Sequence, residues 1–271
     1  MKRRRVAFLG VGNMASALIL ANGGKNIGFE DIILYDKYPK NLERFTEKGA
    51  YVAEALSDAV CSADCILLAV KPQDYFILMD EIRQCDRYKD KLYISIGAGI
   101  EVKTVADYLG CERVVRALPN TPMLIGKGVS AVCKASNVNY DDYVFVRSLF
   151  EGAGSVIEID ESEMNRIIGV TSSSPAYVFE LIKSIAEGAS IQGLDGEELI
   201  SVICDVVAGS AMLLRSSGKS PDEMIAMVAS KGGTTEQALK ALADNGFSET
   251  VTAAMLACTR RADELGKNNK N

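Results

Sequence analysis

Short apolar runs alternate with segments of helical spacing along the first half of the chain. The apolar runs cover residues 6–10, 31–36, 63–70, 91–99 and 112–118, and helical spacing recurs at residues 14–21, 40–48, 74–84 and 102–109. The runs lack a strict alternation of polar and apolar positions, which is typical of strands that helices cover on both faces. The order of these elements therefore predicts a doubly wound, mainly parallel sheet.

Two further runs extend this pattern before the strand signal ends. Residues 128–134 and 155–159 flank a helical segment and predict strands that complete one edge of the sheet, in a direction that the pattern does not indicate. Beyond Asp160, apolar residues recur every three or four positions in segments broken at glycines. We predict an α/β protein with a Rossmann-like, doubly wound domain at residues 1–160 and an all-helical domain at residues 161–271.

Two of the later helical segments, residues 174–192 and 199–214, are apolar around most of their circumference. The second falls short of the roughly 20 residues that a membrane-spanning helix needs, and it carries Asp205 near its middle. A small helical domain cannot cover this much apolar surface by itself, so we expect a second copy of the chain to cover it. The pattern predicts a homo-oligomer that does not insert into a membrane.

Composition and charge exclude several kinds of site. The 30 Lys and Arg against 36 Asp and Glu give a net charge of -6, opposite to the basic surface that nucleic acid requires. The chain has no histidine, which excludes Ser-His and Cys-His nucleophile pairs and imidazole-bound zinc. Its seven cysteines form no C-x-x-C pair, so we predict no metal site and no disulfide framework, and we expect reduced thiols in a cytoplasmic protein.

A glycine-rich turn, Gly10-Val11-Gly12-Asn13-Met14-Ala15, lies directly after the first predicted strand and before a predicted helix. In this context the first glycine permits a tight turn, and the second lets a pyrophosphate approach the backbone at the helix N-terminus. The alternative is a tight strand-to-helix turn with no ligand. We predict a dinucleotide site.

The end of the second predicted strand bears on the choice of dinucleotide. An acidic residue there, Asp36, can accept hydrogen bonds from the adenosine ribose diol and repel a 2′-phosphate, which favours NADH. Lys37 and Lys40 stand beside it, and either can neutralise a phosphate or simply lie in solvent. The cofactor is therefore NADPH or NADH, with a slight preference expected for NADH.

Three later strand ends are candidates for the same site, because ligands of open parallel sheets bind at the carboxyl ends of the strands. These ends are Ala69-Val70-Lys71-Pro72, residues 95–99 with Gly97, and residues 119–122 with Asn120. Lys71 could act as a general acid, orient amide or ribose groups, or be an ordinary surface lysine.

In the helical part, Ser230-Lys231-Gly232-Gly233-Thr234-Thr235 precedes a predicted helix. Thr234 and Gln237 have the spacing of a capping box. Two glycines before a helix N-terminus also expose backbone N–H groups that suit a small carboxylate or phosphate. Helix capping alone is the alternative interpretation of this turn.

Five motifs, taken in order, resemble those of pyrroline-5-carboxylate reductases. They are F-L-G-V-G-N-M at residues 8–14, A-V-K-P at 69–72, R-A-L-P-N-T-P at 116–122, S-S-P-A-Y at 173–177 and S-K-G-G-T-T at 230–235. The resemblance covers nearly the whole chain. It implies reduction of the C=N bond of 1-pyrroline-5-carboxylate by NADPH or NADH, which gives L-proline in the last step of proline biosynthesis. It also implies that the helical domain serves dimerisation and substrate binding, in a homodimer or a ring of dimers whose active sites form where subunits intertwine.

The resemblance and the strand ends together define the predicted site. The cofactor set is Leu9, Gly10, Gly12, Asn13, Met14, Asp36, Lys37, Ala69, Val70, Lys71, Pro72, Gly97 and Asn120. The substrate set is Glu161, Ser230, Gly232, Gly233, Thr234 and Thr235. By the same resemblance, the backbone of the turn binds the substrate carboxylate, the Thr235 hydroxyl is catalytic through a hydrogen bond to the ring nitrogen, and Glu161 lies close to the substrate. No protein general acid is assigned, because a cyclic imine can arrive already protonated.

Three departures from the family pattern involve four residues. Ser172 stands where relatives commonly have glycine, and Lys231 replaces a frequent proline in the carboxylate-binding turn. Asp36 and Leu56 occupy positions where NADPH-using relatives tend to have hydroxyls and an asparagine, which argues against assuming a preference for NADPH.

Two other functions share parts of this pattern. A hydroxyacid dehydrogenase has a similar start and a helical second domain, but it relies on a lysine in the interdomain helix, where this chain offers only Lys183, well past the first turn. A non-catalytic dinucleotide-binding sensor would keep the fold without the reaction, and the intact G-G-T-T turn argues against it.

Overall fold

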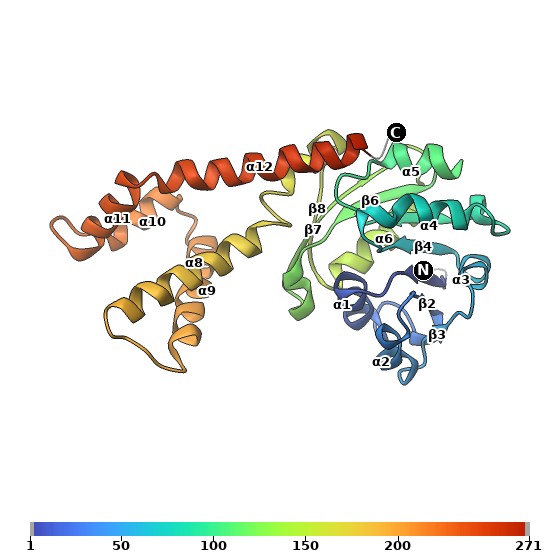
Figure 1. The fold of residues 1–271 in the computed structure, drawn as a ribbon, viewed down its shortest axis with the longest axis horizontal. Coiled ribbons are helices and arrows are strands. Elements are labelled where there is room, and N and C mark those ends of the chain that lie inside the picture. The colour runs from blue at the N-terminus through green and yellow to red at the C-terminus, as the bar shows by residue number, and fades with distance from the viewer. Residues whose placement is uncertain (1–2, 269–271) are drawn as a thin grey trace. The chain divides into compact units, whose positions relative to one another are not determined.

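The computed structural model describes residues 3–268, and the side chains of residues 3–266 (Figure 1). The chain forms two compact units. The first comprises the chain up to Ser173 and again from Ala257, and the second comprises Ser174–Leu256. The functional boundary predicted after residue 160 stays a prediction.

The first unit is built on one eight-stranded sheet with the order β3-β2-β1-β4-β5-β6-β7-β8. The strands are β1 (Val6–Leu9), β2 (Ile32–Tyr35), β3 (Tyr51–Val52), β4 (Cys65–Leu68), β5 (Leu92–Ser95), β6 (Val114–Leu118), β7 (Gly128–Lys134) and β8 (Gly154–Glu158). All neighbours are parallel except β6 and β7, which are antiparallel. This confirms the mainly parallel sheet and the edge formed by the last two strands, and it adds the two-residue strand β3, which the sequence pattern did not indicate.

Helices cover both faces of this sheet (Figure 1). The α-helices are α1 (Asn13–Asn22), α2 (Glu43–Thr46), α3 (Leu56–Ser62), α4 (Tyr75–Ile82), α5 (Val102–Leu109), α6 (Tyr140–Glu151) and α7 (Met164–Ile167), and short 3₁₀ turns lie at Phe29–Asp31, Pro39–Asn41, Pro72–Asp74, Tyr88–Asp90, Thr121–Ile125 and Glu161–Glu163. Val6 and Phe8 of β1 pack with residues of α1 and α6. Ala7 and Leu9 of the same strand pack with residues of α3, α4 and α5. Two cores on opposite faces explain why β1, β2 and β4 are apolar at every position.

The helix predicted at residues 40–48 is shorter than expected. Residues Pro39–Asn41 form a 3₁₀ turn, α2 covers only Glu43–Thr46, and Gly49 has a φ of +92°. A left-handed glycine ends a helix because other residues adopt that conformation at a cost. The apolar residues Leu42 and Phe45 still reach the core.

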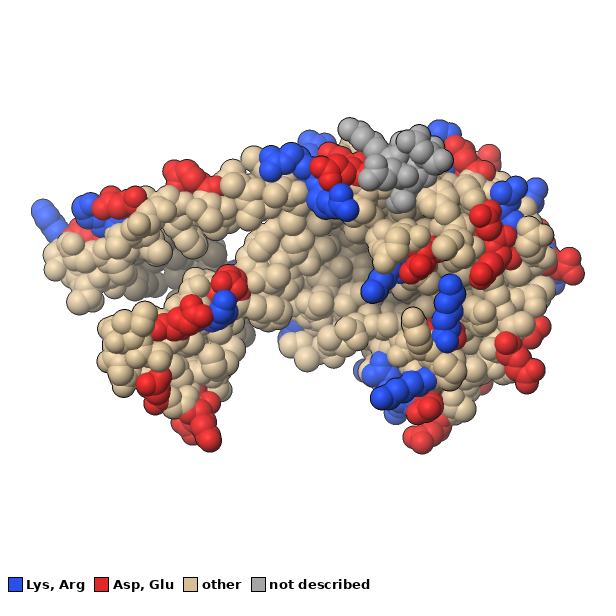
Figure 2. Space-filling view, in the orientation of Figure 1, with Lys and Arg blue, Asp and Glu red and all other residues tan. Residues whose placement is uncertain are grey.

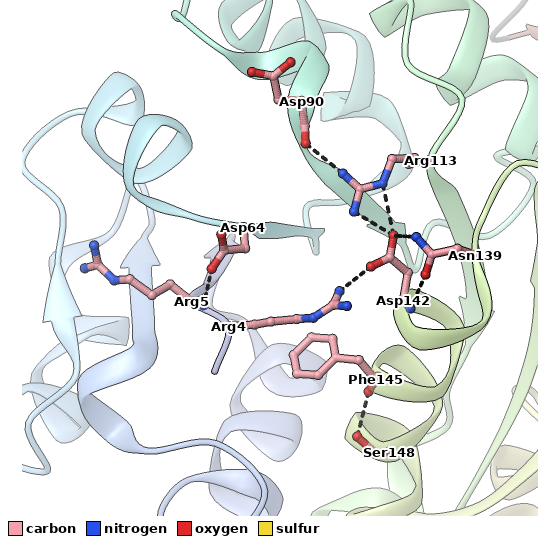
Figure 3. Close-up of polar contacts among 9 residues, drawn as sticks. All are labelled: Arg4, Arg5, Asp64, Asp90, Arg113, Asn139, Asp142, Phe145 and Ser148. Atoms are coloured by element: carbon pink, nitrogen blue, oxygen red, sulfur yellow. Dashed lines mark hydrogen bonds and ion pairs between the residues drawn. The ribbon is translucent and has the colours of Figure 1, made fainter. Parts of the chain in front are cut away.

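An ion cluster joins the amino ends of β1 and β6 to α6 (Figure 3). Asp142, with a side chain that is 3% exposed, pairs with Arg4 at 2.5 Å and with Arg113 at 2.6 Å. Asn139 caps α6 by accepting a hydrogen bond from the Asp142 N–H. Burial opposes ionisation of Asp142, but the bonds and charges of Arg113 and Arg4 outweigh it and lower its pKa below the ordinary value of 3.8.

The second unit is all-helical within the described residues, as predicted. Its helices are α8 (Ser174–Ile191), α9 (Leu199–Ser217), α10 (Pro221–Val228), α11 (Thr234–Asp244) and the first part of α12 (Phe247–Asn268). The later part of α12 belongs to the first unit, where Ala262 is buried in the core. A Cβ on Gly99 would lie 2.7 Å from the Ala262 carbonyl oxygen, so only glycine permits this close packing.

Large apolar side chains are exposed along α8 and α9. Phe179 is 62% exposed and Met212 is 71% exposed, and on α9 only Ile203 is buried within the described chain. Figure 2 shows tan surface between the few charged side chains of this part of the molecule. By length and composition alone, α9 is the one described helix that could cross a membrane. Exposed apolar side chains that gather on neighbouring helices mark an interaction surface.

All seven cysteines are free thiols. Cys65, Cys111 and Cys133 are buried, whereas Cys204 on α9 is exposed. Burial raises the pKa of the Cys133 thiol to about 12. These three buried cysteines act as small apolar residues of the core.

Candidate functional site

The glycine-rich turn joins β1 to α1 at the position where the strand order diverges, between β1 and β4. Gly10 has a φ of +89°, and a Cβ on it would lie 3.0 Å from the Ala69 carbonyl carbon. Both the turn and the neighbouring strand therefore require glycine there. Gly12 is the N-cap of α1, and a Cβ on it would enter open space. This space beside a helix N-terminus fits a diphosphate.

A groove of about 400 Å³ opens beside this turn. Eight of the predicted cofactor residues line it, namely Leu9, Gly10, Gly12, Asp36, Lys37, Ala69, Val70 and Lys71. The volume lies within the usual range of ligand sites, about 300–1,000 Å³. The groove also includes Tyr38, Asn41 and Gln73, which sequence reasoning missed although each lies within a few residues of a predicted strand end.

Asp36, at the end of β2, is bonded to the glycine-rich turn. Its Oδ2 atom accepts hydrogen bonds from the Val11 N–H at 2.6 Å and from Asn41 Nδ2 at 3.2 Å, and its Oδ1 atom accepts from the Tyr38 N–H at 2.8 Å. A carboxylate has about four acceptor positions. Three of them serve the protein, which leaves about one for a ribose hydroxyl. The expected preference for NADH stays a prediction.

The other predicted cofactor residues do not line the groove. Asn13 is exposed at the first position of α1, Met14 packs against the core, and Pro72 begins a 3₁₀ turn. Asn120 is buried, and both ends of its amide are hydrogen-bonded: Nδ2 donates to the Thr171 carbonyl at 2.9 Å, and Oδ1 accepts from the Val129 N–H at 2.8 Å. Their contact with a cofactor stays a prediction.

The buried side chain of Tyr75 explains why residue 97 is a glycine. A Cβ on Gly97 would lie 2.7 Å from the Tyr75 ring. The Tyr75 hydroxyl donates to the Leu68 carbonyl at 2.7 Å and accepts from the Ile96 N–H at 3.2 Å, so it ties the ends of β4 and β5 together. Burial raises the pKa of Tyr75 to about 12, so the phenol stays neutral. This tyrosine fixes the ends of the two strands relative to each other.

Glu161 lies in the first unit beside the buried Arg116. The Arg116 side chain is 1% exposed, its Nη1 atom is 3.5 Å from Glu161 Oε1, and its Nη2 atom donates to Asn165 Oδ1 at 2.8 Å. Glu161 Oε1 also accepts from the Val102 N–H at the start of α5, at 2.6 Å. Among the residues that the structure describes, Arg116 Nε has no hydrogen-bond partner. The role of Glu161 near a substrate stays a prediction.

The turn before α11 brings the other predicted substrate residues together. Gly232 has a φ of +75°, and a Cβ on Gly233 would lie 2.6 Å from Ser230 Oγ. The left-handed conformation therefore favours glycine at position 232, and a side chain at position 233 would force Ser230 to move. Thr235 is half-buried, and Thr234 is exposed. The first N–H groups of an α-helix have no acceptor within the helix, so those of Thr234 and Thr235 can bind an anion.

The predicted capping box of Thr234 and Gln237 is wrong. Helix α11 begins at Thr234, its N-cap is Gly233, and no side chain caps it through a hydrogen bond. Instead, Glu236 Oε2 accepts a hydrogen bond from the Gly232 N–H at 2.8 Å. The helix starts one residue earlier than this capping box requires, with Gly233 as the N-cap, which places Thr234 inside the first turn. A capping box does form at α10, between Ser220 and Glu223.

Comparison with known proteins decides the family. A family profile described as "Pyrroline-5-carboxylate reductase dimerisation" matches residues 161–265, and one described as "NADP oxidoreductase coenzyme F420-dependent" matches residues 5–99. The pyrroline-5-carboxylate reductase of Escherichia coli K12 is 32% identical over 269 residues, which cover 97% of this chain and 99% of that protein. The chain belongs to the pyrroline-5-carboxylate reductase family.

Further members of the pyrroline-5-carboxylate reductase family support this. The enzyme of Methanosarcina acetivorans is 30% identical over 274 residues, covering 98% of this chain and all of that protein. The crystal structure of Plasmodium falciparum pyrroline carboxylate reductase with NADP bound has a TM-score of 0.89 at 28% identity, covering 98% of this chain and 99% of that one. The resemblance stated from the motifs and the predicted fold class are both confirmed. The dimerisation match includes α8 and α9, the helices with exposed apolar faces.

Proposed function

We propose that this chain is an NAD(P)H-dependent pyrroline-5-carboxylate reductase, which reduces the C=N bond of 1-pyrroline-5-carboxylate to L-proline in the last step of proline biosynthesis. The observation that carries the proposal is the near full-length identity of 32% to a reductase of that name, in a chain that has both a glycine-rich turn and a G-G-T-T turn. The hydroxyacid dehydrogenase alternative requires a lysine near the start of α8, and this chain has none there.

The cofactor is assigned to the groove beside Gly12. The open space at Gly12 and the N-terminus of α1 suit the diphosphate, and the segment from Asp36 to Lys37 suits the adenosine ribose. Lys71, which is exposed in the groove, can orient ribose or amide groups. When bound, the reduced nicotinamide supplies a hydride.

The substrate carboxylate is assigned to the turn at residues 230–235. Backbone N–H groups and the dipole of α11 favour an anion there, and the Thr235 hydroxyl hydrogen-bonds the ring nitrogen. The imine carbon receives the hydride, and the nitrogen keeps the proton that it carries as an iminium ion, so the product is a secondary amine. Since the electrophile brings its own proton, a chain with no histidine needs only to orient the reactants and exclude water.

The assembly is assigned as a homodimer or a ring of dimers in the cytoplasm. The exposed apolar residues of α8 and α9 lie within the segment that the dimerisation profile matches, which supports a second copy as the partner that covers them. Because a second copy would cover these apolar faces, we expect no insertion into a membrane. The net charge of -6 leads us to expect no binding of nucleic acid. NADH is expected to serve at least as well as NADPH.

The test is an absorbance assay that follows oxidation of the reduced dinucleotide by pyrroline-5-carboxylate. The competing reaction, oxidation of 3-hydroxy acids by the oxidised dinucleotide, is assayed in the same way. Turnover of the imine is expected. Thr235→Ala should lower turnover far more than it weakens dinucleotide binding, whereas Thr235→Ser, which keeps the hydroxyl, should retain most activity. Dinucleotide binding without oxidation in the wild type would favour a sensor and refute the proposal.

A further inference from the structure

The turn before α11 is partly occupied by acceptors of its own chain. The Gly232 N–H donates to Glu236 Oε2 at 2.8 Å, and the Gly233 N–H donates to the Ser230 carbonyl at 2.9 Å. The first of these acceptors is a carboxylate. It takes one of the backbone donors that the proposed function assigns to the carboxylate of the substrate.

We propose that Glu236 is a specificity-determining residue that competes with the substrate carboxylate for the Gly232 N–H. The inference rests on the proposed function, because it concerns the same turn. In the free enzyme the turn is closed by an internal anion, and substrate binding exchanges this anion for an external one. Glu236 thereby weakens the binding of every ligand that uses a carboxylate at this turn, and it does not affect ligands that lack one.

The exchange follows from the chemistry of a single N–H group. One N–H makes one strong hydrogen bond, so two carboxylates cannot both use it fully. The internal carboxylate is only four residues away along the chain and is therefore always near its donor. Both residues are exposed, so solvent weakens the internal bond and lets the side chain rotate away. The expected effect on affinity is accordingly modest, about two- to fivefold.

Charge adds to the effect in the same direction. Two carboxylates at one helix N-terminus repel each other, so even a displaced Glu236 opposes a bound anion. Lys231, the residue that replaces a frequent proline in this turn, is exposed and brings a compensating positive charge. Repulsion depends on charge alone, whereas occupancy of the N–H depends on an acceptor that reaches Gly232, and variants can separate the two.

The same contact also has a purely structural interpretation, and the chain contains a matched control for it. Glu223 occupies the equivalent third position of α10 and accepts a hydrogen bond from the Ser220 N–H at 2.7 Å. Both glutamates are exposed, and both bond backward to an N–H at a helix start. Only Glu236 does so at the turn assigned to the substrate. A stability effect is expected for both, and an affinity effect only for Glu236.

The experiment measures kcat and KM for pyrroline-5-carboxylate at saturating reduced dinucleotide in the wild type, Glu236→Ala, Glu236→Gln, Glu236→Asp and Glu223→Gln. Inhibition by L-proline and by pyrrolidine, which lacks the carboxylate, is measured in parallel with thermal unfolding. We expect Glu236→Ala to lower KM and the proline inhibition constant by about two- to fivefold, with a much smaller change in kcat and none in pyrrolidine inhibition. Glu236→Asp keeps the charge but shortens the side chain, so it should lower KM as well.

The outcomes separate the inference from the proposed function. If the wild type does not reduce the imine, the proposed function fails. If it does, an unchanged or raised KM in Glu236→Ala overturns the inference, since a raised value means that Glu236 shapes the turn for the substrate. An equal change in Glu223→Gln overturns it too, because helix capping then explains the effect. If KM falls for Glu236→Ala but not for Glu236→Asp, Glu236 does not act by occupying the Gly232 N–H. The inference is then overturned, and only charge repulsion between the two carboxylates explains the effect.

Discussion

Replacing Asp36 by asparagine separates the two roles that its position allows. The carboxylate binds the Val11 and Tyr38 N–H groups, which shapes the groove for either cofactor. Its negative charge discriminates only against a 2′-phosphate. Asparagine has one acceptor oxygen, so its NH₂ group must face one of these two N–H donors. The loss of that bond costs about 1–3 kcal/mol and should raise KM for both NADH and NADPH.

The charge effect follows from Coulomb's law. In solvent, two unit charges about 4 Å apart interact by roughly 1 kcal/mol, and a phosphate monoester carries about 1.5–2 charges. Removing the carboxylate should therefore favour NADPH over NADH by about 1–2 kcal/mol, which is a 5- to 30-fold rise in the ratio of the two kcat/KM values. The effect on the turn is common to both cofactors and cancels in this ratio.

The assay determines kcat/KM for each reduced dinucleotide in the wild type, Asp36→Asn and Asp107→Asn. Asp107 is an exposed residue of α5 that pairs with Lys103, so its replacement changes the net charge equally without touching the groove. The rise in ratio should appear only for Asp36→Asn and should shrink with added salt. If KM rises for both cofactors while the ratio stays within about twofold, the carboxylate serves only the turn, and the reasoning from charge is refuted.

Three further substitutions test other parts of the structure. Gly12→Val adds a side chain in open space at a φ of -73°, so the free energy of unfolding should change by no more than about 1 kcal/mol. The dissociation constant of the dinucleotide, measured by fluorescence titration, should rise at least about tenfold. An unchanged dissociation constant would contradict the placement of the diphosphate. Asp142→Asn leaves Arg4 and Arg113 unpaired and should lower the free energy of unfolding by about 2–3 kcal/mol at neutral pH in denaturant titrations. Because the folded pKa of Asp142 is lowered, that difference should be present above pH 3.8 and vanish as the pH falls through the folded value, and a difference that persists in acid would exclude the ion cluster as its cause. Val206→Glu places a charge on the exposed face of α9, where Val206 is 63% exposed, and should reduce the oligomer mass measured by light scattering; an unchanged mass would exclude this face from the interface.

Much of the architecture could be predicted because its signals are local. Each buried strand is a short apolar run, and both glycine-rich turns mark a helix start. The direction of β7 could not be predicted, because an apolar run reads alike in both directions. The strand β3 has only two residues, Tyr51 and Val52, too few for any periodicity.

The hydrogen bonds of the site residues were harder to predict because the bonded partners are distant in sequence. Glu161 bonds the Val102 N–H, 59 residues away, and the Asn120 amide bonds the Thr171 carbonyl, 51 residues away. No local pattern encodes such pairs. The occupant of the Gly232 N–H could have been found, since Glu236 lies four residues on and glutamate is favoured in the first turn of a helix.

The return of α12 to the first unit means that the helical unit is an insertion with two covalent attachments, at Ser173 and at Ala257. Simple truncation after Ser173 would thus remove Ala262 and leave the backbone at Gly99 facing solvent instead of its packed neighbour. A soluble, isolated nucleotide-binding fragment should therefore require a linker that joins residue 173 to residue 257, so that the later part of α12 is retained.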